Sequence, residues 1–362
     1  MYDIAIIGAG PAGATLARLV DKDYKILLLD KRQLSKSADL TSTVKCCGGL
    51  LAPDAQKILA KSGLGLPKDV LVDPQIFAVR TIDLYNKIEK YYQRFYLNID
   101  REKFDRWLVS IIPHQIDLRF GCYFKNYIKD KDFYKINFLH NGKEYSENAK
   151  LIIGADGANS LVRRQEFPLQ GNLKKYISIQ EWFEVEETLP YFSAIFDPEI
   201  TDFYSWTIPK GDNLIIGAAL SIEDDPVQKF ELLKSKLKNY GFVFDKRTKK
   251  EGAFILRPQS IKDICTGKDR VTFIGEAAGW ISPSSAEGFS YAFQSANEAA
   301  QALNQGIDGF QLRYAMACGG LRRNIILKNM KSSIMYNKTL RKMAMSTGIQ
   351  SIEIKATINL HG

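Results

Sequence analysis

The chain opens with an apolar run that ends in three closely spaced glycines. Residues 3–13 read Asp-Ile-Ala-Ile-Ile-Gly-Ala-Gly-Pro-Ala-Gly, which predicts a buried strand, a tight turn and the start of a helix. Gly8 permits the turn, Gly10 leaves room for a ligand beside the backbone, and Gly13 lets the helix pack close to the strand. This spacing is typical of a dinucleotide-binding turn, in which the helix N-terminus faces a pyrophosphate.

The residues beyond the glycines support the same interpretation. Pro11 and Ala12 begin the expected helix, and a proline fits there because the first N–H groups of a helix have no helical partner. A second apolar run, residues 25–29, ends at Asp30, about 20 residues beyond the glycines, where such sites place an acid that binds a ribose hydroxyl. Strand, turn, helix, strand and acid thus follow in the order that a dinucleotide site requires.

Length and cysteine content exclude several classes of protein. At 362 residues and 45% hydrophobic content the chain can bury a large core, and we expect two domains. No apolar run reaches the roughly 18 residues of a membrane-spanning helix. The first strand begins at residue 3, which leaves no room for a signal peptide, and the cysteines are odd in number without zinc-ligand spacing. We therefore expect a cytoplasmic protein.

The ionisable residues narrow the choice of ligands. The formal net charge of +9 favours anionic partners. No nucleic-acid-binding motif is present, so we expect no nucleic acid partner. His114, His140 and His361 lie too far apart in sequence to suggest a metal pair, and we expect no metal site.

Two later segments repeat the pattern of a buried strand that ends in small residues. Residues 151–157 read Leu-Ile-Ile-Gly-Ala-Asp-Gly, and residues 271–279 read Val-Thr-Phe-Ile-Gly-Glu-Ala-Ala-Gly. An α/β sheet binds its ligands at such strand ends, so we expect a discontinuous cofactor domain with a sheet-rich domain inserted. The expected cofactor domain comprises residues 1–72, 100–170 and 263–308, the substrate domain residues 73–99 and 171–262, and a C-terminal helical segment residues 309–362.

Several motifs together resemble a known family of flavoproteins. With the first glycine turn, Gly154-Ala-Asp156-Gly157 and Gly275-Glu276-Ala-Ala-Gly279 in this order, residues 1–305 resemble FAD-dependent oxidoreductases of the p-hydroxybenzoate hydroxylase fold class. That resemblance implies an α/β fold, with a Rossmann-like FAD-binding domain of glutathione reductase type 2 and an inserted substrate domain. The chain is further similar to the geranylgeranyl reductase family in three places: Cys47-Gly48-Gly49, residues 204–210 (Tyr-Ser-Trp-Thr-Ile-Pro-Lys), and Pro283 with Glu287-Gly288. Within that family, residues 47–56 are closest to the bacterial CbrA-like branch.

The resemblance implies that FAD is the cofactor and that all three turns hold it. Lys31 or Arg32 would flank the adenine or the pyrophosphate. Glu276 stands where relatives have an aspartate, and Gly288 and Phe289 open a helix whose N–H groups would face the flavin ring. The implied FAD-binding residues are Gly8, Gly10, Pro11, Ala12, Gly13, Asp30, Lys31, Arg32, Cys46, Gly48, Gly49, Arg101, Asp156, Gly275, Glu276, Gly288 and Phe289.

The resemblance also implies a substrate site beside the flavin. Cys47 would lie near the ring as the proton donor, or would serve only as a small apolar residue of the turn. Asp156 would lie near the pyrophosphate, or would only organise its own turn. Tyr204, Trp206 and Pro209 would line a cavity whose apolar walls suit an isoprenoid chain or an aromatic ring.

The resulting hypothesis is an FAD-dependent oxidoreductase that reduces double bonds of a hydrophobic, isoprenoid-type (geranylgeranyl) substrate by hydride transfer. No second glycine motif for a nicotinamide is present, so NADPH or another external electron donor would dock only transiently. Two alternatives remain open. One is an FAD-dependent monooxygenase or halogenase that acts on an aromatic substrate, and the other is a non-catalytic flavin- and lipid-binding protein.

The C-terminal segment mixes basic and apolar residues. Eight lysines and arginines lie between Arg313 and Lys342, interspersed with leucine, isoleucine and methionine. A basic amphipathic helix of this kind binds an anionic membrane surface or packs on the cofactor domain with its charges in water. The sequence leaves both interpretations open. If the helix binds a membrane, the protein makes peripheral membrane contact.

Overall fold

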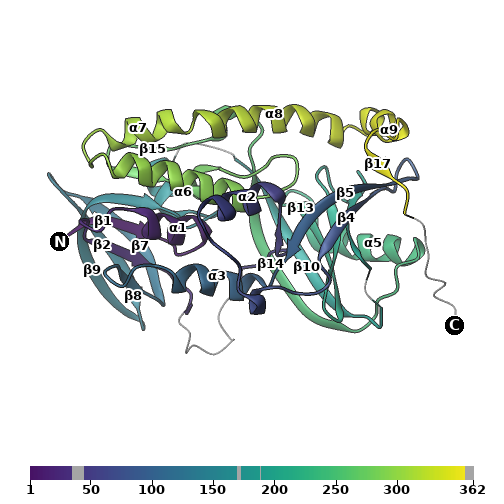
Figure 1. The fold of residues 1–362 in the computed structure, drawn as a ribbon, viewed down its shortest axis with the longest axis horizontal. Helices are drawn as coiled ribbons and strands as arrows, with labels where there is room; N and C mark the ends of the chain where they lie inside the picture. Colours follow the sequence, from purple (N-terminus) through teal and green to yellow (C-terminus); the bar gives the residue numbers. More distant parts are fainter. Residues whose placement is uncertain (35–44, 169–172, 188, 355–362) are drawn as a thin grey trace.

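Two sheets with surrounding helices make up the computed structural model, which describes residues 1–34, 45–168, 173–187 and 189–354 (Figure 1). The first sheet has the strand order β15-β16-β9-β1-β2-β6, and β8 pairs with both β7 and β9. Its strands are β1 (Tyr2–Ile7), β2 (Ile26–Leu29), β6 (Asp117–Arg119), β7 (Cys122–Lys129), β8 (Tyr134–His140), β9 (Lys143–Gly154), β15 (Gly267–Lys268) and β16 (Val271–Phe273).

The centre of the first sheet is parallel and buried, as the apolar runs predict. β1 pairs in parallel with β2 and β9, and β16 pairs in parallel with β9. Ile7 and Phe273 both lie opposite Gly154, so three strand ends from distant parts of the chain meet at one edge of the sheet. The turns that follow these ends therefore lie side by side.

Helices pack on this sheet, and α1 and α6 begin where the sequence predicts. Prolines stand at the first turn of α1 and α2, and the Asp100 side chain caps α3 by accepting hydrogen bonds from the N–H groups of Glu102 and Lys103. α6 packs against α1, α2, α7 and α8. These helices and short 3-10 turns are α1 (Pro11–Leu19), α2 (Pro53–Lys61), η1 (Lys68–Val70), α3 (Arg101–Ser110), α4 (Leu161–Glu166), η2 (Ile261–Asp263), η3 (Gly275–Ala278) and α6 (Phe289–Leu303).

The second sheet has the strand order β14-β10-β13-β12-β11-β4-β5-β17, and β3 pairs with β5. α5 (Pro226–Asn239) covers part of it with Phe230, Leu233 and Leu237, which join a separate hydrophobic core. The strands are β3 (Leu50–Leu51), β4 (Ile76–Asp83), β5 (Ile88–Asn98), β10 (Lys174–Glu184), β11 (Tyr191–Phe196), β12 (Ser205–Lys210), β13 (Asn213–Ser221), β14 (Arg247–Arg257) and β17 (Ser351–Ile352).

The C-terminal helices run along one edge of the molecule and cover both sheets' domains (Figure 1). They are α7 (Phe310–Ala317), α8 (Gly319–Tyr336) and α9 (Lys338–Ser346). α9 is tied to β4 by a buried ion pair in which Arg341 Nε lies 2.7 Å from Asp83 Oδ2. Within the described ranges, no helix combines the length and apolar character needed to cross a membrane.

Candidate functional site

The glycine turn after β1 is built as its spacing predicts. Gly8 has a φ of +108°, and a Cβ there would lie 2.5 Å from the carbonyl oxygen of Ala155, the residue after β9. A Cβ on Gly13 would collide with the Gly8 carbonyl oxygen. These two glycines are therefore required by the protein's own packing.

Gly10 differs from its neighbours because it faces open space. The nearest atom to a Cβ built on Gly10 is the Arg32 Nη2, at 3.9 Å. Gly10 is also the N-cap of α1, and no side chain caps that helix. A helix N-terminus with uncapped N–H groups and an open approach is a binding site for a phosphate. Ala12 packs behind the turn, 2.8 Å from where a Cβ of Gly275 would lie.

Asp30 binds the glycine turn from the end of β2. Its Oδ2 accepts a hydrogen bond from the Ala9 N–H at 2.7 Å, and both carboxylate oxygens accept hydrogen bonds from the Arg32 guanidinium at 3.1 Å. The Arg32 N–H adds a fourth bond to Oδ1. Since a carboxylate has about four lone-pair sites, a ribose hydroxyl would have to displace Arg32 from Asp30. Lys31 is exposed.

Arg32 and Arg101 share a second carboxylate that the sequence analysis missed. Asp105, on α3, lies 2.6 Å from Arg32 Nη1 and 2.9 Å from Arg101 Nε. Burial disfavours the charge of Asp105, but the two guanidiniums outweigh it and hold the pKa of that carboxyl below its ordinary range. The Arg101 guanidinium also lies 4.7 Å from the centre of the Phe289 ring at the start of α6. This network joins α3 and α6 to the glycine turn.

Asp156 lies beside the turn with one oxygen unsatisfied. Its Oδ2 accepts hydrogen bonds from the N–H groups of Leu161 and Val162, so it caps α4. Its Oδ1 is buried and has no hydrogen-bond partner among the described residues. Burial raises the pKa of this carboxyl, against the effect of its hydrogen bonds. A buried acceptor without a partner, next to Gly8, suits a ligand that brings a donor.

Glu276, in the turn after β16, bridges the two sheets. Its Oε2 lies 3.0 Å from Lys45 Nζ, and its Oε1 accepts a hydrogen bond from the N–H of Leu256 on β14 at 3.2 Å. The longer glutamate side chain thus reaches the inserted domain. Its predicted contact with FAD stays a prediction.

The start of α6 has its own acid. Glu287 accepts hydrogen bonds from the N–H of Ser290 at 2.8 Å and from the Ser290 hydroxyl at 2.5 Å, and burial raises its pKa. The side of the helix at Gly288 stays open, because a Cβ there would meet only Ile281, at 3.9 Å. A ligand can therefore reach the N-terminus of α6 at Gly288 and Phe289.

The Cys47-Gly48-Gly49 turn is pressed against the inserted domain. The Cys47 carbonyl accepts a hydrogen bond from Gln180 Nε2, and the Cys47 sulfur accepts one from the Gly49 N–H, both at 3.4 Å. Cβ atoms on Gly48 and Gly49 would collide with Ile208 and with the Ile99 carbonyl oxygen. Cys46 lies apart from this contact: its buried thiol is 3.7 Å from the Ser178 hydroxyl on β10, and burial raises its pKa to about 12.

Lys210 is the second residue that the sequence analysis missed. It is buried at the end of β12, and its Nζ donates hydrogen bonds to the carbonyl oxygens of Gly49 at 3.0 Å and Ile99 at 2.6 Å. Burial lowers the pKa of Lys210 to about 7. Two carbonyl acceptors satisfy both hydrogens of a neutral amine, so the neutral form fits this place. Lys210 thereby fastens the Cys47 turn to the start of α3.

A stability measurement tests the state of Lys210. Between about pH 7 and pH 10 the unfolded chain binds a proton at this lysine that the folded chain does not, so stability rises with pH. The free energy of unfolding of the wild type minus that of Lys210→Met is therefore expected to increase by a few kcal/mol over this range. Urea unfolding at several pH values measures it. A difference that does not change with pH would mean that the amine keeps its ordinary pKa in the fold.

Tyr204, Trp206 and Pro209 all lie at β12, where the Cys47 turn meets the second sheet. The Tyr204 hydroxyl donates a hydrogen bond to the Ser285 carbonyl oxygen at 2.8 Å, and its ring centre lies 5.4 Å from that of Trp206. Trp206 packs flat on Gly217, and its buried Nε1 has no partner among the described residues. Pro209 is buried and its carbonyl oxygen accepts from Asn98. Their predicted contact with a substrate stays a prediction.

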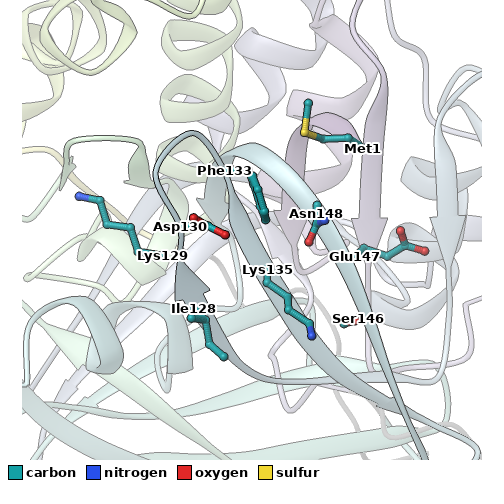
Figure 2. Close-up of a pocket in the computed structure, with 9 residues that line it drawn as sticks. All are labelled: Met1, Ile128, Lys129, Asp130, Phe133, Lys135, Ser146, Glu147 and Asn148. Atoms are coloured by element: carbon teal, nitrogen blue, oxygen red, sulfur yellow. The ribbon is translucent and has the colours of Figure 1, made fainter.

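A hollow of about 400 Å³ lies elsewhere, on the outer strands of the first sheet (Figure 2). Phe133, Lys135 and Glu147 line it together with Met1. None of the predicted site residues belongs to it. His140 on β8 hydrogen bonds to Cys122, and His361 lies outside the described residues. The described part of the chain holds no cluster of side chains suited to a metal ion.

The arrangement fits a long dinucleotide such as FAD. The open face at Gly10 and the uncapped N-terminus of α1 suit a pyrophosphate, and the unpartnered Oδ1 of Asp156 suits a hydroxyl donor. The start of α6 is joined to the glycine turn through Arg101, whose guanidinium lies over the Phe289 ring. Asp105 belongs to no motif and Lys210 ends the motif of residues 204–210 without a predicted role, so only the contacts of the folded chain reveal what they do.

Comparisons with known proteins bear on the family and the fold of this chain. No family model matches the chain. The chain is 39% identical over 351 residues to the protein CbrA of Escherichia coli O9:H4 (strain HS), which covers 97% of this chain and 94% of that protein.

Three solved structures share the fold at low sequence identity. A geranylgeranyl bacteriochlorophyll reductase-like protein from Thermoplasma acidophilum has a TM-score of 0.82 at 18% identity, covering 99% of this chain and 94% of its own. The flavin-dependent halogenase CmlS has a TM-score of 0.66 at 16% identity, and the match covers 90% of this chain and 63% of that chain. PqsL, a probable FAD-dependent monooxygenase from Pseudomonas aeruginosa, has a TM-score of 0.67 at 16% identity. The match covers 96% of this chain and 99% of that chain.

These neighbours confirm the predicted fold, an α/β arrangement of the FAD-binding p-hydroxybenzoate hydroxylase type. Because its identity to CbrA extends over nearly the whole of both sequences, the chain belongs to the CbrA family.

Proposed function

We propose that this protein binds FAD along its three strand-end turns and is an oxidoreductase that reduces a double bond of a hydrophobic, isoprenoid-type substrate. The observation that carries the proposal is the contact between the Cys47 turn and the aromatic strand β12. Gly48 lies under Ile208, and Lys210 reaches back to Gly49. A residue that can donate a proton and an apolar wall thus lie together at the boundary of the two domains.

The chain's own residues have distinct roles in this proposal. When bound and reduced, FAD would supply the hydride. Gly10 and the N-terminus of α1 would hold the pyrophosphate, and the N-terminus of α6 would stabilise the negative charge that flavin reduction builds. The buried aromatic strand excludes water from the reacting carbon and orients the substrate. An external donor such as NADPH supplies the electrons, because the described fold contains one dinucleotide-binding turn.

Cys47 is the proposed proton donor. Its thiol lies near the side chains of Arg101, Tyr204 and Lys210, so it stands among ionisable groups. A proton delivered to one carbon of the double bond complements the hydride delivered to the other. Lys210 holds the turn in place through the Gly49 carbonyl oxygen.

The second candidate is a monooxygenase or halogenase that acts on an aromatic substrate. It is supported by the fold shared with CmlS and PqsL and by the aromatic rings of Tyr204 and Trp206, which lie together at β12. The two reactions differ in their need for oxygen, and that difference separates them by experiment.

Anaerobic oxidation of the reduced protein tests the proposal. FAD-loaded protein is reduced with dithionite without oxygen and mixed with geranylgeranyl compounds, while the flavin absorbance is followed. Reoxidation by the alkene, with a reduced product in the mass spectrum, supports the proposed reaction. Reoxidation by oxygen alone, coupled to hydroxylation or halogenation of an aromatic compound, would assign the second function. A flavin that reacts with no acceptor except oxygen, without product, would identify a binding protein.

Replacing Cys47 separates its two interpretations. Cys47→Ala is expected to slow the reaction by about 100-fold, because a positioned general acid contributes at least this much. FAD content should not change, since the Gly49 N–H loses only one weak acceptor. Cys122→Ala is the matched control and should keep its rate, because the Cys122 thiol lies on β7 beside His140. A Cys47→Ala variant with the wild-type rate would leave Cys47 as a residue that only fits the turn.

A further inference from the structure

Of the C-terminal helices, α7 and α8 form one nearly continuous rod. The N–H of Cys318 donates to the Tyr314 carbonyl oxygen and the N–H of Arg322 donates to the Cys318 carbonyl oxygen, both at 3.0 Å, so helical bonding continues from α7 into α8. Figure 1 shows α7 and α8 end to end along one edge of the molecule, with α9 at the far end. From Leu312 to Ile334 this rod is about 33 Å long.

The inner face of the rod is fully used by the fold. Leu321, Ile325 and Ser332 are buried, and the Tyr336 hydroxyl donates a hydrogen bond to the Ser284 carbonyl oxygen at 2.8 Å. On α9, Arg341 is buried against Asp83. These contacts give the helices their place on the protein without any need for their outer face.

The outer face of the rod also carries apolar side chains, and these are exposed. On α8, Ile326, Leu327, Met330 and Ile334 are between 47% and 64% exposed, and at 100° per residue they occupy an arc of about 100° opposite the buried side chains. Four further apolar side chains are exposed on the neighbouring helices. They are Leu312 and Met316 on α7 and Leu340 and Met343 on α9. We call these eight residues the outer apolar face.

The charge of this segment has one sign only. Residues 309–352 contain eight lysines and arginines and no aspartate or glutamate. Three of the basic residues turn inward: Arg341 pairs with Asp83, Arg313 donates to carbonyl oxygens of Ala302 and Asp308, and Arg322 lies over Trp280. Those that stay exposed are Arg323, Lys331, Lys338 and Lys342. None of these four pairs with a carboxylate of the described residues.

We propose that the outer apolar face lies on an anionic lipid bilayer. Leucine, isoleucine and methionine would enter the boundary between headgroups and acyl chains, while the exposed basic residues contact anionic headgroups. A protein partner is disfavoured because protein interfaces are depleted in lysine, and three of the four exposed basic residues are lysines. This membrane proposal is independent of the reaction proposed for the site, so a failure of that reaction would not contradict it.

Vesicle binding of the full-length protein tests the proposal. The wild type is mixed with vesicles of phosphatidylcholine alone, or of phosphatidylcholine with phosphatidylglycerol, and bound protein is measured by flotation. We expect at least about tenfold tighter binding to the anionic vesicles, and weaker binding at high salt, because salt screens the basic residues. Equal binding to both vesicles, or to neither, would overturn the proposal.

Two variants and a control locate the surface. Leu327→Gln with Met330→Gln should weaken anionic vesicle binding at least about tenfold, and Lys331→Gln with Lys342→Gln should remove most of the salt dependence. Ile222→Gln with Val243→Gln changes two exposed apolar residues that flank α5 and should bind as the wild type does. Circular dichroism melting confirms that each variant is folded. Unchanged vesicle binding by the first variant would contradict the proposal, and so would a dimer that this variant dissociates, because a second copy would then cover the face.

Discussion

Gly10→Ala is expected to fold as the wild type does and to bind FAD roughly 100-fold more weakly, a loss of about 2.7 kcal/mol. The folded chain has room for this methyl group, since the nearest atom lies 3.9 Å away. The methyl group would stand where the pyrophosphate approaches the backbone, and it would hold the phosphates away from the N-terminus of α1. Thermal unfolding and an FAD titration of the same sample measure the two properties separately.

Gly13→Ala is the matched control for that variant. Its methyl group would collide with the Gly8 carbonyl oxygen, so this change is expected to lower the stability of the apoprotein itself. A Gly10→Ala protein that binds FAD with wild-type affinity would mean that no phosphate lies at the glycine turn. A Gly10→Ala protein that is as unstable as Gly13→Ala would mean that Gly10 serves packing alone.

Asp105→Asn is expected to destabilise the protein by about 3–5 kcal/mol and to weaken FAD binding at least about tenfold. Asp105 lies between two buried guanidiniums, and its loss leaves the charge of Arg101 without a carboxylate. The positions of Arg32 and Arg101 beside the glycine turn and Phe289 would then change. Urea unfolding measures the first effect and equilibrium FAD titration the second.

Asp83→Asn supplies the comparison for Asp105. It breaks another buried ion pair, between the end of β4 in the second sheet and Arg341 on α9. We expect a similar loss of stability with unchanged FAD affinity in the part of the protein that remains folded. Equal FAD affinity in both variants would show that the Asp105 network supports only the fold.

The sequence predicted those parts of the fold that depend on neighbouring residues. The strand, glycine turn and helix of residues 2–19 follow from one short pattern, because Gly8 and Gly13 are required by contacts within that unit or with the adjoining strand end. The Asp100 cap of α3 is equally local. The meeting of three strand ends was predicted because parallel strands in an α/β sheet end at one edge.

Contacts between distant residues were not predictable in the same way. Arg32 and Asp105 are 73 positions apart, and Lys210 and Gly49 are 161 apart, so no spacing rule connects them. The sequence pattern also could not distinguish among the basic residues of the C-terminal segment. Arg341 proved to be buried against Asp83, whereas Lys342 beside it is exposed, and only the packing of α9 on β5 decides between them.

FAD titration of the flavin-free protein, followed by the change in flavin fluorescence, tests most directly whether the strand-end turns hold the cofactor. Binding at these turns predicts a single site per chain that saturates with FAD and that Gly10→Ala largely loses. A protein that is purified colourless and leaves the flavin signal unchanged at every FAD concentration would contradict the assignment of the site.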